Sequence, residues 1–150
     1  MILDSRNEFC DAQALNTGAA GKYLVGDVID LENARDIGMG QQLWLVVQVS
    51  TTATSGGAAT ATFTLASDAQ AAIAVDGTET AHTTVGPFAV ANMVAGTTLA
   101  VIALPRQGNV YERYIGIIQE TGTAAFTAGN INCFLVQNAK GWTAYPDGVN

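Results

Sequence analysis

The stretch "AATATFTLA", residues 58–66, alternates small or apolar side chains with threonines. One set of alternate positions carries Ala59, Ala61, Phe63 and Leu65, and the threonines between them form the other set. Because successive side chains of a strand point to opposite faces of a sheet, the stretch predicts a half-buried antiparallel strand with its apolar face toward a core.

Two further stretches extend this pattern. "NINCFLVQ", residues 130–137, places apolar residues opposite asparagines, as a half-buried strand does. "LWLVVQV", residues 43–49, differs because Trp44 and Val46 make its second face apolar as well. It therefore predicts a central strand, or a strand with one face against a partner. Further strands are expected within residues 27–31, 83–90, 98–105 and 111–120.

Turn sequences separate these stretches: "TSGG", "DG", "AGTT", "RQGN", "ETGT" and "TAGN". Short strands at such spacing favour a β-sandwich or barrel. Only "ASDAQAAIAV", residues 66–75, offers a helical signal, and it predicts a short helix or a strand within a loop. The 150 residues are expected to form one all-β antiparallel sandwich domain. A short N-terminal arm (about 1–8) and an irregular C-terminal tail (about 139–150) flank it.

The composition narrows the class of partner. Apolar residues make up 49% of the chain and charged residues 13%, against about 25% charged in ordinary globular domains. Such a chain is expected to bury extra surface against its own copies or a large assembly. The net charge of −7 disfavours a nucleic-acid partner. The apolar runs are too short to cross a membrane, and "MILDSRNEF" lacks the apolar segment of a secretory signal.

Catalytic and metal-binding patterns are sparse. His82 is the only histidine and is expected to be exposed in "ETAHTTVG", so we expect neither an enzyme nor a cofactor. One histidine and two distant cysteines do not supply a zinc site. Asp27, Asp30, Glu32 and Asp36 are either calcium ligands or a solvated strand end with its turn. The missing Asp-x-Asp-x-Asp-Gly alternation favours the strand end.

The two cysteines and the apolar start of the chain each leave alternatives open. Cys10 and Cys133 can pair only if the first and last strands are neighbours, and without a signal peptide they are expected to stay reduced and buried. Met1, Ile2 and Leu3 either complete the domain's own sheet or pack on a neighbouring subunit. We expect them to contribute more to binding a partner than to the domain's own stability.

Three stretches together resemble a known family. "MILDSRNEFCDAQAL", "VIDLENARDIGMGQQLWLVVQV" and "LPRQGNVYERYIGIIQETGTAAFTAGNINCFLVQNA" are similar, in the same order, to the jelly-roll capsid cement (decoration) proteins of tailed bacteriophages. They cover about half of the chain. Gly116 and Ile117 depart from the polar or basic alternation of the family's corresponding strand, and "GWTAYPDGVN" matches no part of it.

The resemblance implies a jelly-roll sandwich on the outer surface of the virion's capsid, assembled in the host cytoplasm, without catalysis or a cofactor. Its partners would be the major capsid protein and further copies of itself, as a homodimer or homotrimer. The expected partner-binding residues are Met1, Ile2, Leu3, Arg6, Arg35, Arg106, Arg113, Trp142 and Tyr145. For Arg106 and Arg113 the alternative is a solvated strand-end charge. The rival function is a carbohydrate-binding or receptor-binding sandwich that stacks sugars on Trp44, Trp142 and Tyr145.

Overall fold

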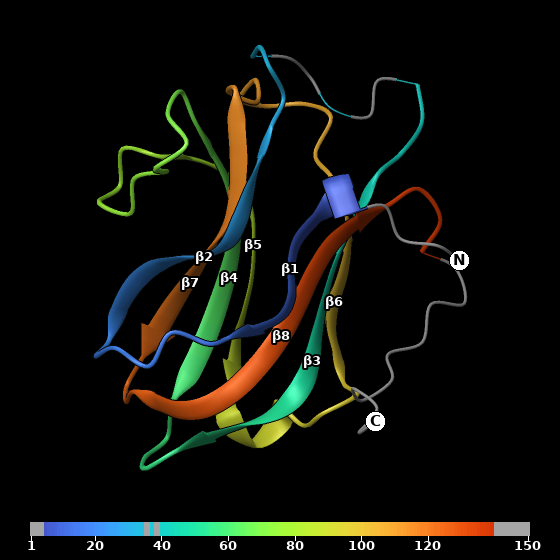
Figure 1. The fold of residues 1–150 in the computed structure, drawn as a ribbon. Coiled ribbons are helices and arrows are strands. Elements are labelled where there is room, and N and C mark those ends of the chain that lie inside the picture. The colour runs from blue at the N-terminus through green and yellow to red at the C-terminus, as the bar shows by residue number, and fades with distance from the viewer. Residues whose placement is uncertain (1–4, 35–36, 38–39, 140–150) are drawn as a thin grey trace.

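The computed structural model describes residues 5–34, 37 and 40–139 (Figure 1). Within these ranges the chain forms eight strands and two short 3-10 helices, with no α-helix. The elements are η1 (Ser5–Asn7), β1 (Glu8–Ala14), β2 (Gly21–Asp30), β3 (Trp44–Ser55), β4 (Thr60–Asp68), β5 (Thr80–Ala89), η2 (Val90–Asn92), β6 (Thr98–Ala103), β7 (Tyr114–Gly122) and β8 (Phe126–Val136). In this part of the chain, no helix has the length and apolar character needed to span a membrane.

The strands form two four-stranded antiparallel sheets. One has the order β1-β8-β3-β6 and the other the order β2-β7-β4-β5, and Figure 1 shows them as two facing layers. The pairs β1–β8 and β2–β7 join strands far apart in the sequence, as in the jelly roll, where two Greek keys close into a double sheet. The prediction of an all-β antiparallel sandwich is therefore confirmed.

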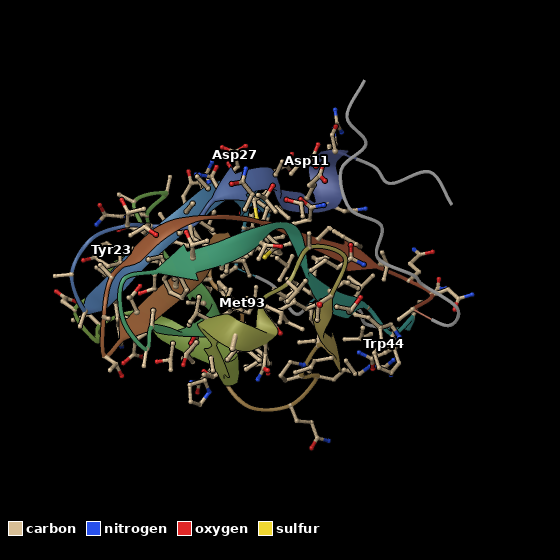
Figure 2. The ribbon with its side chains drawn as sticks, turned by 90° about the horizontal axis from the view of Figure 1, so that it is seen from below. Asp11, Tyr23, Asp27, Trp44 and Met93 are labelled. Carbon is tan, nitrogen blue, oxygen red and sulfur yellow. The ribbon has the colours of Figure 1, made fainter. Side chains whose placement is uncertain are left out.

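The main core lies between the two sheets. Phe63 and Leu65 from β4 meet Leu45 and Val47 from β3, and all four side chains are almost completely buried. Full burial of one such side chain stabilises the fold by roughly 1.5–3 kcal/mol. The predicted inward faces of β3 and β4 are therefore correct. Met93, after η2, is also fully buried in this core cluster and is labelled near the middle of the molecule in Figure 2.

The outer face of the β2-β7-β4-β5 sheet has its own apolar cover. Ile73, from the loop between β4 and β5, packs with Ala66 and Ile118 in a separate buried cluster. Gly116 on β7 lies below this loop, and a Cβ there would stand 2.8 Å from Cδ1 of Ile73. The glycine that departs from the cement-protein pattern thus makes room for the loop.

The outer face of the other sheet is apolar too. Val46, Phe134 and Val136 form a third buried cluster, with Trp44 and Ala139 packed against it. β3 pairs with both β6 and β8, so it is central, as its two apolar faces predict.

Two local predictions are wrong. Residues 66–75 form neither a helix nor a separate strand: the segment's start completes β4, and Asp68 then accepts hydrogen bonds from the backbone N–H groups of Gln70 and Ala74 in a loop. "TAGN" is not a turn but lies inside β8, where Gly129 has a φ of 130° and comes close to the backbone of Ala53. The hairpin turn follows Gly122, with Thr123 at a φ of 68°, where "ETGT" predicts a turn.

Candidate functional site

An ion pair joins β2 to β7 at the surface. Arg113 donates from Nε to Asp30 Oδ1 at 2.9 Å and from Nη2 to Asp30 Oδ2 at 2.8 Å. The antiparallel pairing of β2 and β7 positions the two groups, since Asp30 is the register partner of Tyr114. The guanidinium also lies 4.8 Å from the centroid of the Tyr114 ring. This geometry is the bidentate fork that arginine forms with carboxylates.

The pair shifts the titration of both groups. The hydrogen bond from Arg113 is the main reason that the pKa of Asp30 falls from 3.8 to about 2, and the same bond raises the pKa of Arg113. The fork predicted to face a partner is therefore already engaged by a carboxylate of the same chain. A role of Arg113 in partner binding stays a prediction.

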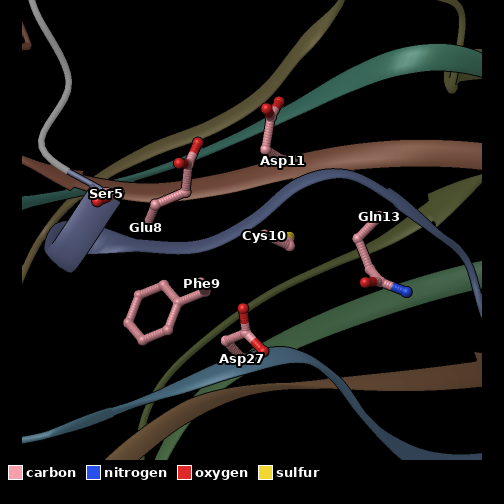
Figure 3. A pocket seen from close by; sticks show the side chains of 7 residues that line it. All are labelled: Ser5, Glu8, Phe9, Cys10, Asp11, Gln13 and Asp27. Carbon is pink, nitrogen blue, oxygen red and sulfur yellow. The ribbon is translucent and has the colours of Figure 1, made fainter.

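A shallow hollow of about 260 Å³ lies between β1 and β2 (Figure 3). Three of its seven lining residues are acidic, and Ser5 of η1 also lines it. Burial, followed by repulsion from Asp11, raises the pKa of Glu8. The lining residues are Ser5, Glu8, Phe9, Cys10, Asp11, Gln13 and Asp27.

A second hollow of about 460 Å³ shares part of this lining. It brings Arg6 to the same surface as Asp30 and Glu32, and Asp30 in turn holds Arg113. Two of the predicted partner-binding arginines, Arg6 and Arg113, therefore border one acidic surface. Sequence reasoning missed this gathering because it depends on β1, β2 and β7 coming together at one end of the sandwich.

His82 is half-buried, so the prediction of an exposed histidine is wrong. Its Nε2 shares a hydrogen bond of 2.7 Å with Ser67 Oγ, and its ring stacks on Tyr111 with centroids 3.8 Å apart. Ser67 Oγ also accepts the backbone N–H of Glu112 at 3.1 Å, and the Glu112 carboxylate accepts from Thr80 Oγ1 at 2.7 Å. Burial lowers the pKa of His82, and the negative charge of Glu112 opposes the shift.

This group contains a serine, a histidine and a carboxylate, as nucleophilic sites do. Ser67 has no exposed surface, however, so its hydroxyl is closed to a substrate. The contacts instead tie the segment that precedes β7 to strands β4 and β5. These contacts form a buried, hydrogen-bonded polar network that holds the loop before β7 in place.

Cys10 and Cys133 are direct register partners on β1 and β8. The condition for pairing, that the first and last strands be neighbours, is met, yet both thiols are free and buried. The hydrogen bond with Cys10, together with burial, raises the pKa of Cys133 well above its ordinary value. A buried thiol with a raised pKa reacts slowly, because the thiolate is the nucleophile.

The remaining predicted residues divide into two groups. Arg106 is exposed in the segment between β6 and β7. Six others lie outside the described residues: Met1, Ile2, Leu3, Arg35, Trp142 and Tyr145. Within the described ranges no histidine, cysteine or carboxylate group has the arrangement to hold a metal ion. Asp36, part of the calcium alternative, is also outside these ranges.

The strand order defines the fold as a jelly-roll β-sandwich. Polar side chains line two hollows on its surface, and the contacts of Ser67 with His82 and Glu112 form a closed polar network inside it. The family model of Bbp16 matches residues 9–135, from the second residue of β1 to the last residue but one of β8. The chain belongs to the Bbp16 family. No curated protein matches it.

Proposed function

We propose that this protein is a capsid cement (decoration) protein that binds the outer surface of an assembled phage head and stabilises the contacts between major capsid protein subunits. Membership of the Bbp16 family carries the proposal, since the family's name suggests a phage-associated protein. The jelly-roll fold agrees with the cement proteins that the sequence resembles. The proposal assigns no catalysis, cofactor, nucleic acid or membrane to the protein.

The mechanism is mass action. A protein that binds only the assembled shell lowers the free energy of that state by its binding free energy. Each contact is weak on its own, but a small homo-oligomer that touches several capsid subunits gains through multivalency. The net charge of −7 keeps the protein away from packaged DNA and suits a position on the outer surface.

The acidic surface around β1 and β2 is the proposed contact region. Ser5 and Arg6 border its hollows, so the described part of the chain begins at this surface. Met1, Ile2 and Leu3 would lie in a groove of a neighbouring subunit, where burial of Ile and Leu contributes roughly 1.5–3 kcal/mol each. Ordering three residues at a chain end costs about 1–2 kcal/mol each, so a single arm gains little, and the gain comes from its repetition on every symmetric copy.

Co-sedimentation with purified heads that lack this protein tests the proposal. The full chain should pellet with assembled heads and remain in the supernatant with unassembled capsid protein. Deletion of residues 1–3 should abolish pelleting and leave the melting temperature almost unchanged. Val94→Lys, at an exposed valine just after η2 and away from the predicted partner-binding residues in sequence, is the control and should pellet normally.

Two results would contradict the proposal. Absence of the protein from purified virions would exclude a cement role. A large drop in melting temperature on deleting residues 1–3, with head binding retained, would show that the arm belongs to the domain's own sheet. Binding on a glycan array without head binding would favour the carbohydrate-binding alternative.

A further inference from the structure

The described strands include four at sheet edges, and three of these carry features that block pairing with another strand. β1 contains Glu8 and Asp11 and two register irregularities. β2 contains three charged residues and an irregularity after Val25. β5 contains Pro87, which has no N–H to donate, and two irregularities. Charges, prolines and bulges are the usual protections of edge strands against pairing.

β6 lacks the first two of these protections. Its sequence, "TLAVIA" from Thr98 to Ala103, contains no charged residue and no proline. It pairs with β3 in regular register from Ala100 to Ala103, with a single irregularity near Thr98. β6 is the last strand of its sheet, so among the described strands only β3 pairs with it. A regular, uncharged and apolar edge is a template for strand pairing.

The ladder shows which backbone groups face outward. The N–H of Leu104 donates to the carbonyl of Leu43 at 2.9 Å, which marks these two residues as a hydrogen-bonded pair. Hydrogen-bonded and non-hydrogen-bonded pairs alternate along an antiparallel ladder. Val101, three residues earlier and opposite Val46, is therefore in a non-hydrogen-bonded pair, and its N–H and C=O point away from β3, toward the edge of the sheet.

The side chain of Val101 adds to this surface. It is the register partner of Val46, so it lies on the outer face of the sheet beside the apolar cluster around Trp44. Its side chain is one of four large apolar ones that the described chain leaves exposed, at 39%. Among the described residues, the edge of the sheet and an apolar face thus meet at Val101.

We propose that β6 is the interface through which two copies of this chain pair, β6 to β6 and antiparallel, across a two-fold axis. The β1-β8-β3-β6 sheets of the two copies then join into one eight-stranded sheet, and Val101 of each copy lies near its centre. This pairing makes the homo-oligomer of the proposed function a dimer and identifies β6 as its contact. It does not depend on capsid binding.

Charge selects β6 as the edge through which two copies can pair. A two-fold interface brings each residue of the strand near its own counterpart. With a net charge of −7 on each chain, self-pairing of β1 would place Glu8 and Asp11 near like charges, which destabilises cross-strand pairs. Self-pairing of β6 brings no charges together, so it is the edge where two acidic copies approach without local repulsion.

Light scattering after size exclusion tests the proposal on the full chain. The wild type should have twice the 15.5 kDa mass of one chain. Val101→Lys places a charge at the centre of the contact and should shift the dissociation constant at least tenfold toward monomer. Val110→Lys makes the same change at a valine that is 57% exposed on a loop, and it should remain a dimer.

Hydrogen exchange identifies the contact itself. The outward amide of Val101 should exchange slowly at high protein concentration and faster on dilution, whereas the inward amide of Ile102 should not change. A wild type that is a monomer or a trimer overturns the proposal, as does a Val101→Lys variant that stays a dimer. Protection of the Val101 amide that is independent of concentration, or that appears only on heads, also overturns it, because the occupant is then the chain's own segment or a capsid strand.

Discussion

Gly116 on β7 lies directly below Ile73, the residue that closes the outer face of its sheet. A Cβ on Gly116 would stand 2.8 Å from Cδ1 of Ile73 and 3.2 Å from atoms of Leu24 and Val28. Gly116→Ala should therefore destabilise the fold by about 1–3 kcal/mol, the usual cost of overpacking. Urea unfolding measures the change.

Ile73→Val removes the atom in closest contact and provides the second half of a double-mutant cycle. Alone it should cost about 0.5–1.5 kcal/mol. Combined with Gly116→Ala it should cost clearly less than the sum of the two single changes, because residues in contact do not act additively. Strict additivity would show that Ile73 does not rest on Gly116.

The Arg113–Asp30 pair predicts an acid-sensitive contribution to stability. The pKa of Asp30 is lowered from 3.8 to about 2, so the contribution is present above pH 4 and is lost as the pH falls from about 4 to about 2. In Arg113→Gln the Asp30 midpoint should move up toward 3.8. NMR titration of the carboxyl carbons measures it.

Asp76 supplies an internal control for that titration. Its pKa is also lowered, but by hydrogen bonds from Thr78, so Arg113→Gln should leave it unchanged. Equal movement of both midpoints would point to a general change of the fold instead of the loss of one ion pair.

His82 predicts a second loss of stability on acidification, at a higher pH than the loss that involves Asp30. Burial lowers its pKa in the folded protein, whereas an unfolded chain takes up this proton near pH 6.5. Stability is therefore full above about pH 6.5 and should decrease as the pH falls below it. The titration of the His82 ring protons, unique in this chain, should show a midpoint below 6.5.

His82→Gln should remove that pH dependence of the unfolding free energy while the fold is retained. The measurement is urea unfolding between pH 7 and about pH 5. A folded-state midpoint at or above 6.5 would mean that Glu112 outweighs burial.

The cysteine pair should remain a pair of free thiols. Cys10 and Cys133 are buried register partners, and the reducing cytoplasm in which we propose assembly disfavours disulfides. Intact mass spectrometry of native protein should give the fully reduced mass, and alkylation should be slow until the protein is unfolded. A Cys10–Cys133 bond in native virions would contradict this.

The strand faces follow from the sequence because alternation is local. The pattern of Ala61, Phe63 and Leu65 correctly predicts an inward face, and the apolar Trp44 and Val46 correctly predict that β3 is central. Neither inference requires knowledge of which strands are neighbours.

The errors arise where tertiary contacts override local signals. "TAGN" has the composition of a turn, but Gly129 is needed inside β8 for its close approach to Ala53. His82 lies among threonines, yet Tyr111, from a distant segment, covers its ring. The meeting of Arg6, Asp30 and Arg113 likewise depends on the pairing of β2 with β7, which spacing alone does not reveal.

Because β1 pairs with β8, the first strand cannot join its sheet until the last strand has been synthesised. Ala12 donates its N–H to Asn132 Oδ1, a residue 120 positions later. Until β8 leaves the ribosome, β1 has no sheet neighbour, and Phe9 and Cys10 have no finished core to enter. Folding dominated by such distant pairs is slow. Phe9 and Cys10 of the nascent chain therefore stay exposed to solvent until translation is nearly complete, and transiently exposed apolar surface of this kind favours aggregation.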